Sequence, residues 1–129
     1  MCGIAGFVAR EAPADGELHV RRMAEALRHR GPDDSGFYHD PWCSLGHRRL
    51  SIIDLAGGRQ PLSNENGSTW ITYNGEIYNH RDLRAELERR GHRYTTHCDT
   101  EAIVHAFEEY GPACVDHFRG MFAFALWNK

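Results

Sequence analysis

The sequence lacks the features that mark a secreted, membrane-bound or metal-binding protein. It contains four cysteines in 129 residues but no Cys-x-x-Cys pair, so the spacing indicates neither a zinc site nor a disulfide framework. No apolar run approaches the ~18 residues of a membrane span. The first residues, MCGIAGFV, lack the basic segment of a secretory signal. We therefore expect a cytoplasmic protein with reduced thiols and no membrane partner.

Excess charge of one sign is also missing. The formal net charge is −3, so no overall positive field would attract nucleic acid. The nine histidines include no His-x-x-x-His pair, and we expect no metal site. With 41% apolar and 26% charged residues, the composition is that of an ordinary globular domain, or of a part of one.

The chain alternates irregularly between strand and helix patterns. In chain order, the patterns predict a strand at 2–9, a helix at 17–29, a strand pair at 36–48, a strand from Trp70, a tight turn at Asn74-Gly75, a helix capped by Asn79, a strand at 92–96, a helix from Asp99 or Thr100, and a strand at 121–127. Because no regular β-α-β alternation occurs, we expect an α+β fold. The chain stops directly after the last strand, which we interpret as a C-terminal truncation.

Cys2 is the residue with the clearest chemical potential. If Met1 is removed, Cys2 carries both a thiol and a free α-amine, whose reference pKa is about 7.7–8.0. A neutral amine can accept the thiol proton, so one residue can serve as nucleophile and base. The alternative is a cysteine that merely occupies a strand, and the Met-Cys dipeptide alone leaves this open.

Several further blocks follow this start. They are RHRGPDDSG at 28–36, LGHRRLSIID at 45–54, YNGEIYN at 73–79, DTE at 99–101 and GMFAFA at 120–125. Together with MCGIAG at 1–6, and in this order, they resemble the class II glutamine amidotransferases, which are N-terminal nucleophile hydrolases. Among these, the blocks look most similar to the asparagine synthetase branch.

The resemblance implies a fold and a domain organisation. The fold would be an αββα sandwich, with two antiparallel sheets between helix layers, here C-terminally truncated. Residues 1–129 would be the N-terminal part of a glutaminase domain. An ATP-dependent synthetase domain would follow in the same polypeptide, outside this chain, and would use ATP and magnesium. The chain itself would need no cofactor.

The resemblance also assigns roles to residues. Cys2 would attack glutamine, and Asn74 with Gly75 would form the oxyanion hole. The Arg49 guanidinium would bind the α-carboxylate and Asp99 the α-ammonium. The residues that it assigns to glutamine are Arg49, Leu50, Ser51, Ile52, Ile53, Asn74, Gly75, Glu76 and Asp99. Taken alone, Asp99 would be interpreted as a helix N-cap. Cys98 stands where the family has serine, which affects only a local hydrogen bond.

The function that the resemblance implies is hydrolysis of L-glutamine to glutamate and ammonia through a Cys2 thioester. The ammonia would serve amidation of aspartate. Two alternatives stay open: a non-catalytic or partner-docking remnant of such an enzyme, and an amidotransferase with a different acid acceptor. The sequence also leaves a homodimer open.

Overall fold

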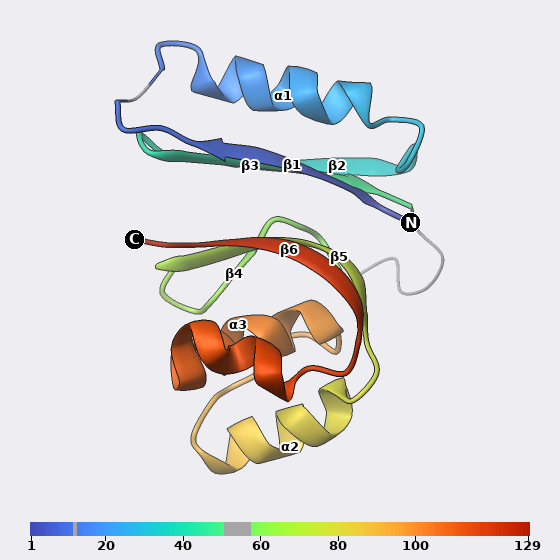
Figure 1. Cartoon of the computed structure of the whole chain (residues 1–129), viewed down its shortest axis with the longest axis vertical. Helices are drawn as coiled ribbons and strands as arrows, with labels where there is room; N and C mark the ends of the chain where they lie inside the picture. The colour runs from blue at the N-terminus through green and yellow to red at the C-terminus, as the bar shows by residue number, and fades with distance from the viewer. Residues whose placement is uncertain (12, 51–57) are drawn as a thin grey trace.

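In the computed structural model, two antiparallel sheets are stacked between helix layers (Figure 1). The structure describes residues 1–11, 13–50 and 58–129. Helix α1 (Gly16–Ala26) covers the outer face of the first sheet, and α2 (His80–Arg89) and α3 (Asp99–Tyr110) lie on the outer side of the second. The expected αββα sandwich is confirmed.

The first sheet contains three strands in the order β1-β3-β2. These are β1 (Gly3–Val8), β2 (Asp34–His39) and β3 (Cys43–Arg49). The connection between β2 and β3 is closed by Asp40, whose Oδ1 accepts hydrogen bonds from the backbone N–H groups of Trp42 (2.8 Å) and Cys43 (2.7 Å). This side-chain mimic of a backbone turn explains why the predicted strand pair forms across Asp40.

Helix α1 packs on this sheet through Val20 and Ala24, which are four residues apart and buried. A Cβ on Gly46 of β3 would lie only 3.1 Å from the Val20 side chain, so glycine lets helix and sheet approach closely. The helix ends at Ala26, three residues before the predicted end. Tight i to i−3 hydrogen bonds, such as Arg30 N to Leu27 O, replace the α-helical pattern there.

The second sheet has the order β4-β5-β6. Its strands are β4 (Leu62–Ser63), β5 (Thr69–Ile77) and β6 (Gly120–Asn128). The predicted turn at Asn74-Gly75 is wrong, because both residues lie within β5 and pair with Ala123 and Phe122 of β6. Pairing along the whole of β6 overrides the local turn preference of this dipeptide.

The outer layer of the second sheet contains α2, α3 and a 3₁₀ helix (Gly111–His117) that the sequence did not predict. Asn79 precedes α2 as expected, but its side chain bonds His117 O and Arg119 N, each at 2.9 Å, rather than capping the helix. The predicted strand at 92–96 is wrong. There the Glu101 carboxylate accepts the backbone N–H groups of Thr95 and Thr96, both at 2.7 Å, in place of a neighbouring strand.

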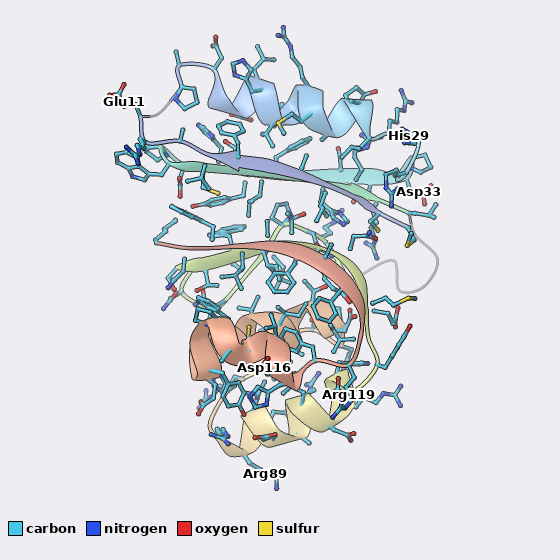
Figure 2. All side chains as sticks on the ribbon, viewed as in Figure 1. Glu11, His29, Asp33, Arg89, Asp116 and Arg119 are labelled. Carbon is cyan, nitrogen blue, oxygen red and sulfur yellow. The ribbon has the colours of Figure 1, made fainter. Side chains whose placement is uncertain are left out.

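The apolar core is divided between two layers (Figure 2). The larger cluster fills the space between the second sheet and its helices; its buried members are Ile71, Tyr73, Ile77, Leu83, Leu87, Ala102, Ile103, Val104, Ala106, Cys114 and Phe118. A smaller cluster between the sheets is built on Tyr38, Cys43 and Leu45. Cys43 and Cys114 are both buried, where they serve as small apolar side chains.

Among the described residues, no helix combines the length and apolar character needed to cross a membrane.

Candidate active site

Cys2 lies immediately before β1 and is half-buried. Because Gly3 pairs with Arg48, the next position in this antiparallel register places Cys2 opposite Arg49. The Nε–H of Arg30 donates a 3.1 Å hydrogen bond to the backbone carbonyl oxygen of Cys2. The chain terminus that carries the thiol is therefore held to the loop between α1 and β2.

The two adjacent arginines at the end of β3 point to opposite faces of the sheet. Arg48 faces α1, where its Nε–H donates to Gly31 O at 3.0 Å and its guanidinium lies 3.7 Å from Glu25. By strand alternation, Arg49 faces the second sheet. A Cβ on Gly58 would lie 3.2 Å from Arg49 Nη2, so the guanidinium packs directly against the backbone there.

Arg49 lines a cavity of about 270 Å³. Its other lining residues are Asp34, Ser35, Gly36, Phe37, His47, Arg59, Gln60 and Pro61. Two guanidinium groups, those of Arg49 and Arg59, line this cavity, which is the donor set that binds a carboxylate well.

His47 lines the same cavity and is almost completely buried, with 2% of its surface exposed. Burial lowers the pKa of His47 to about 4, outweighing a hydrogen bond to the backbone of Tyr73. The positive charge of Arg49 acts in the same direction as burial. The imidazole is therefore neutral at physiological pH.

Asn74 and Glu76 occupy the face of β5 that is directed at the first sheet. Thr72, two residues earlier, donates its hydroxyl to Gly46 O of β3 at 3.2 Å, and strand alternation places Asn74 and Glu76 on the same face. Strands β1 and β5 are in contact. The fold thus brings the strand that follows Cys2 against the strand that carries Asn74.

Asp99 is the first residue of α3, and the N-cap position belongs to Cys98. The expectation that Asp99 caps the helix is therefore wrong. Its Oδ2 instead accepts hydrogen bonds from the Tyr73 hydroxyl (2.6 Å) and the backbone N–H of Ile77 (2.9 Å). Burial and the hydrogen bond to Asp99 raise the pKa of Tyr73, which keeps the hydroxyl protonated as a donor.

Gln60 joins the cavity to the start of α3. Its Oε1 accepts the backbone N–H of Tyr73 at 2.6 Å, and its Nε2 donates to Thr100 Oγ1 at 3.4 Å. Because Gln60 also lines the cavity, it connects the surroundings of Arg49 with the residue beside Asp99.

A comparison with known protein families identifies the family of this chain. The glutamine amidotransferase domain family matches residues 1–129, the whole chain. The chain belongs to this family.

The relatives of this amidotransferase domain carry a consistent name. One is 44% identical over 132 residues, covering 100% of the chain: "Asparagine synthetase [glutamine-hydrolyzing] 1" of Bacillus subtilis (strain 168). Another is 46% identical over 130 residues, covering 98% of the chain: "Asparagine synthetase [glutamine-hydrolyzing] 2" of Oryza sativa subsp. japonica. The matches cover 21% of each relative, so the chain spans about a fifth of their length.

Two solved structures share the fold of this domain. The "structure of the allosteric regulatory enzyme of purine biosynthesis" superposes with a TM-score of 0.75 at 22% identity, covering 95% of this chain and 34% of the other. The glutamine PRPP amidotransferase of B. subtilis, complexed with ADP and GMP, gives a TM-score of 0.69 at 22% identity, covering 99% and 35%. At this identity the likeness establishes the fold alone.

Sequence reasoning missed three residues around the site of this amidotransferase domain. Arg30 lies in the RHRGPDDSG block, one of the blocks that carry the family resemblance, so a signal for it was present. His47 stands in the LGHRRLSIID block, where its burial could not be foreseen. Gln60 lies in no recognised block. Ser51, Ile52 and Ile53 lie outside the described residues, and Leu50 is half-buried directly after β3.

We predict that His47 makes the stability of the domain depend on pH. An unfolded histidine has a pKa near 6.5, whereas folded His47 has a pKa of about 4. Below pH 6.5 the unfolded state binds the proton first, so stability is complete above pH 6.5 and decreases as the pH falls towards 4. Between pH 6.5 and pH 4 the wild type should lose about 3 kcal/mol of unfolding free energy that His47→Gln does not lose. Urea unfolding of the protein at stepped pH measures it.

His19→Gln, which replaces an exposed histidine of helix α1, is the control substitution for this measurement. Carboxylates that titrate below pH 5 also change the free energy of unfolding. They contribute equally to wild type and variant, so their effect cancels in the difference. Identical pH profiles for wild type and His47→Gln would show that His47 is not held neutral in the folded state.

Proposed function

We propose that this chain carries the glutamine-hydrolysing half of an amidotransferase, with Cys2 as the nucleophile. The observation that carries the proposal is the position of Cys2, directly before β1, where the register that pairs Gly3 with Arg48 leads on to Arg49. The family match over the whole chain supports the same reaction.

In the proposed mechanism the free α-amine of Cys2 takes the proton of the Cys2 thiol. The thiolate attacks the side-chain amide carbon of glutamine, and negative charge develops on the carbonyl oxygen. The Asn74 side-chain amide and the Gly75 backbone N–H donate to this oxygen. The C–N bond then breaks as the ammonium of Cys2 returns the proton to the amide nitrogen, which leaves as ammonia. Water hydrolyses the γ-glutamyl thioester to glutamate and regenerates the thiol.

The amino-acid end of glutamine is bound at both charges in this proposal. The Arg49 guanidinium pairs with the α-carboxylate in the cavity of about 270 Å³. Asp99, whose carboxylate is oriented by Tyr73 and Ile77, binds the α-ammonium. Leu50 and Glu76 complete the pocket, and the resemblance also assigns to glutamine Ser51, Ile52 and Ile53, which lie outside the described residues.

The destination of the ammonia follows from the names of the relatives. We propose that it reaches an ATP- and magnesium-dependent synthetase domain of the same cytoplasmic polypeptide, where it amidates aspartate. ATP and magnesium would bind outside these residues, since Gly57-Gly58 lacks the lysine of a phosphate loop. A different acid acceptor is the second candidate, because residues 1–129 contact glutamine and not the acceptor in this proposal.

The test uses the full-length protein and follows glutamate release from glutamine. Arg49→Lys replaces a planar fork by a point charge, so it should raise KM for glutamine about tenfold or more with little change in kcat. Arg48→Lys is the matched control, because Arg48 faces α1 and should leave KM unchanged. Wild-type protein that releases no glutamate would contradict the function. Equal KM values for the two variants would contradict only the placement of the carboxylate.

A further inference from the structure

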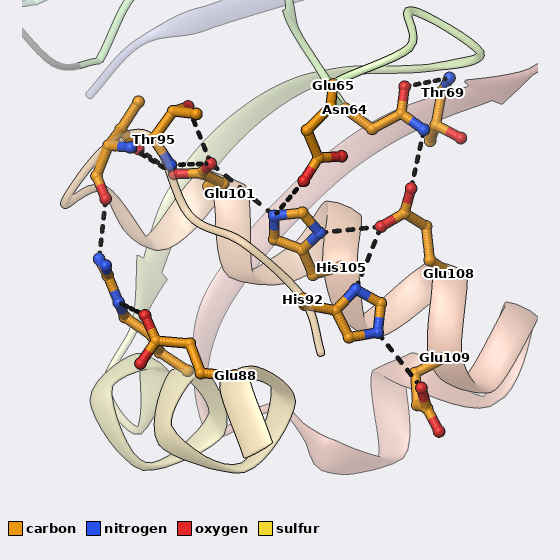
Figure 3. A network of polar contacts seen from close by, with 12 residues as sticks. Asn64, Glu65, Thr69, Glu88, His92, Thr95, Glu101, His105, Glu108 and Glu109 are labelled. Carbon is orange, nitrogen blue, oxygen red and sulfur yellow. Dashed lines mark hydrogen bonds and ion pairs between the residues drawn. The ribbon is translucent and has the colours of Figure 1, made fainter. Parts of the chain in front are cut away.

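A cluster of two histidines and one glutamate lies in the outer layer of the second sheet, apart from the glutamine site (Figure 3). His105 and Glu108 are three residues apart on α3, and His92 follows α2. His105 Nδ1 lies 2.8 Å and His92 Nδ1 3.4 Å from Glu108 Oε2. The ligand atoms of the three residues lie within 4.8 Å of one another.

Two of these three side chains, His92 and Glu108, are oriented by a further polar group on the other atom. His92 Nε2 lies 3.2 Å from Glu109 Oε2. Asn64 Nδ2 donates to Glu108 Oε1 at 2.7 Å, which leaves Oε2 directed at the two imidazoles.

The second ring nitrogen of His105, Nε2, is buried close to two carboxylates. The side chain is 1% exposed, and its Nε2 lies 3.7 Å from Glu101 Oε1 and 3.9 Å from Glu65 Oε1 without a hydrogen bond in the described part of the chain. If neutral His105 donates its Nδ1 proton to Glu108, the bare lone pair of Nε2 faces two carboxylates. A cation on Nδ1 would move the proton to Nε2, where these carboxylates stabilise it.

We propose that His92, His105 and Glu108 bind a zinc ion through His92 Nδ1, His105 Nδ1 and Glu108 Oε2, with water as the fourth ligand. Tetrahedral zinc with bonds of about 2.0–2.1 Å separates its ligand atoms by roughly 3.2–3.5 Å. Here Glu108 Oε2 lies 2.8 Å from His105 Nδ1 and 3.4 Å from His92 Nδ1, so small side-chain shifts would admit the ion. Two imidazoles and a carboxylate suit zinc better than magnesium or calcium. Glu109 holds the far nitrogen of His92, and Glu101 and Glu65 are the carboxylates nearest the far nitrogen of His105.

The cluster is open enough for an ion to enter, since the His92 and Glu108 side chains are 16% and 26% exposed. A bound ion would join the segment after α2 to α3. We had expected no metal, because the sequence holds no His-x-x-x-His pair. The fold instead combines a His-x-x-Glu pair on α3 with a histidine 13 positions earlier in the chain.

The test titrates Zn²⁺ by calorimetry into full-length protein that has been stripped with a chelator. We expect one site that His92→Gln weakens at least about 100-fold and Glu109→Gln about 10-fold or more. His19→Gln, at an exposed histidine of α1, is the matched control and should bind like wild type. Because other parts of the protein can bind Zn²⁺, the difference between His92→Gln and wild type identifies the site.

Two further measurements distinguish lost zinc binding from lost folding, and imidazole ligands from thiolate ligands. Glu108→Gln preserves the side-chain shape and should show the same loss, with circular dichroism confirming that both variants are folded. Co²⁺ in place of Zn²⁺ should give the intense visible bands of four-coordinate cobalt without a thiolate charge-transfer band. Equal Zn²⁺ affinity in wild type and His92→Gln, or a thiolate band that His92→Gln leaves intact, would overturn the proposal.

Discussion

Cys2→Ala should lower glutamine hydrolysis by at least about 10³-fold in the full-length protein, while synthesis from added ammonia continues. The variant removes the only thiol that the proposed mechanism uses, and no thioester can form. Cys2 precedes β1 and is only half-buried, so the fold should tolerate alanine there. Glutamate release, and product formation with glutamine or ammonium chloride as nitrogen source, measure the two activities separately.

Retention of Met1 provides a chemical control on the same residue. With Met1 attached, the nitrogen of Cys2 is an amide that cannot accept the thiol proton, although the thiol remains. Protein that mass spectrometry shows to retain Met1 should therefore release no glutamate. Full activity of such protein would require another base. Glutamine-dependent turnover in Cys2→Ala would remove Cys2 from the mechanism altogether.

Gly75→Ala should destabilise the second sheet by about 2–4 kcal/mol. A Cβ at this position would lie 2.3 Å from the backbone oxygen of Met121 and 2.6 Å from the Cα of Phe122. Backbone atoms of a paired strand cannot move aside as a side chain could, so β5 and β6 must separate locally. Since the proposed oxyanion donor is the N–H of this residue, glutamine hydrolysis should fall together with stability.

Gly67→Ala is the matched control for this prediction. Gly67 has a φ of +70° but no atom within 4 Å of an added Cβ, so alanine should cost only about 1 kcal/mol of backbone strain. Urea unfolding of the two variants compares the cost of steric overlap at position 75 with the cost of backbone strain at position 67. If Gly75→Ala were no less stable than Gly67→Ala, close contact with β6 would not be the reason for glycine at position 75.

Local chemistry was sufficient to predict most of the elements. Val20 and Ala24 at helical spacing, and Leu83 with Leu87, predicted the buried faces of α1 and α2. Asp40 and its neighbours predicted the connection between β2 and β3. These predictions held because each depends on residues close together in the chain, whose side chains bury one face or close one turn. The ordered sequence blocks likewise sufficed to indicate the family.

Other features were decided only when distant segments met. Asn74-Gly75 is a turn dipeptide by its own preference, yet it lies in a strand because β6 pairs with it from about 50 residues further along the chain. Residues 92–96 resemble a strand, but the carboxylate of Glu101 satisfies their backbone instead.

The candidate site likewise combines residues that the sequence indicated with partners that only the tertiary structure placed beside them. The sequence alone indicated which residues to propose for the chemistry, above all Cys2, Arg49 and Asp99. The tertiary structure decided their surroundings: Arg30 on the carbonyl of Cys2, and Gln60 between the cavity and α3. Such partners cannot be predicted from local patterns, because a hydrogen bond between residues 28 or 40 positions apart depends on how sheets and helices pack.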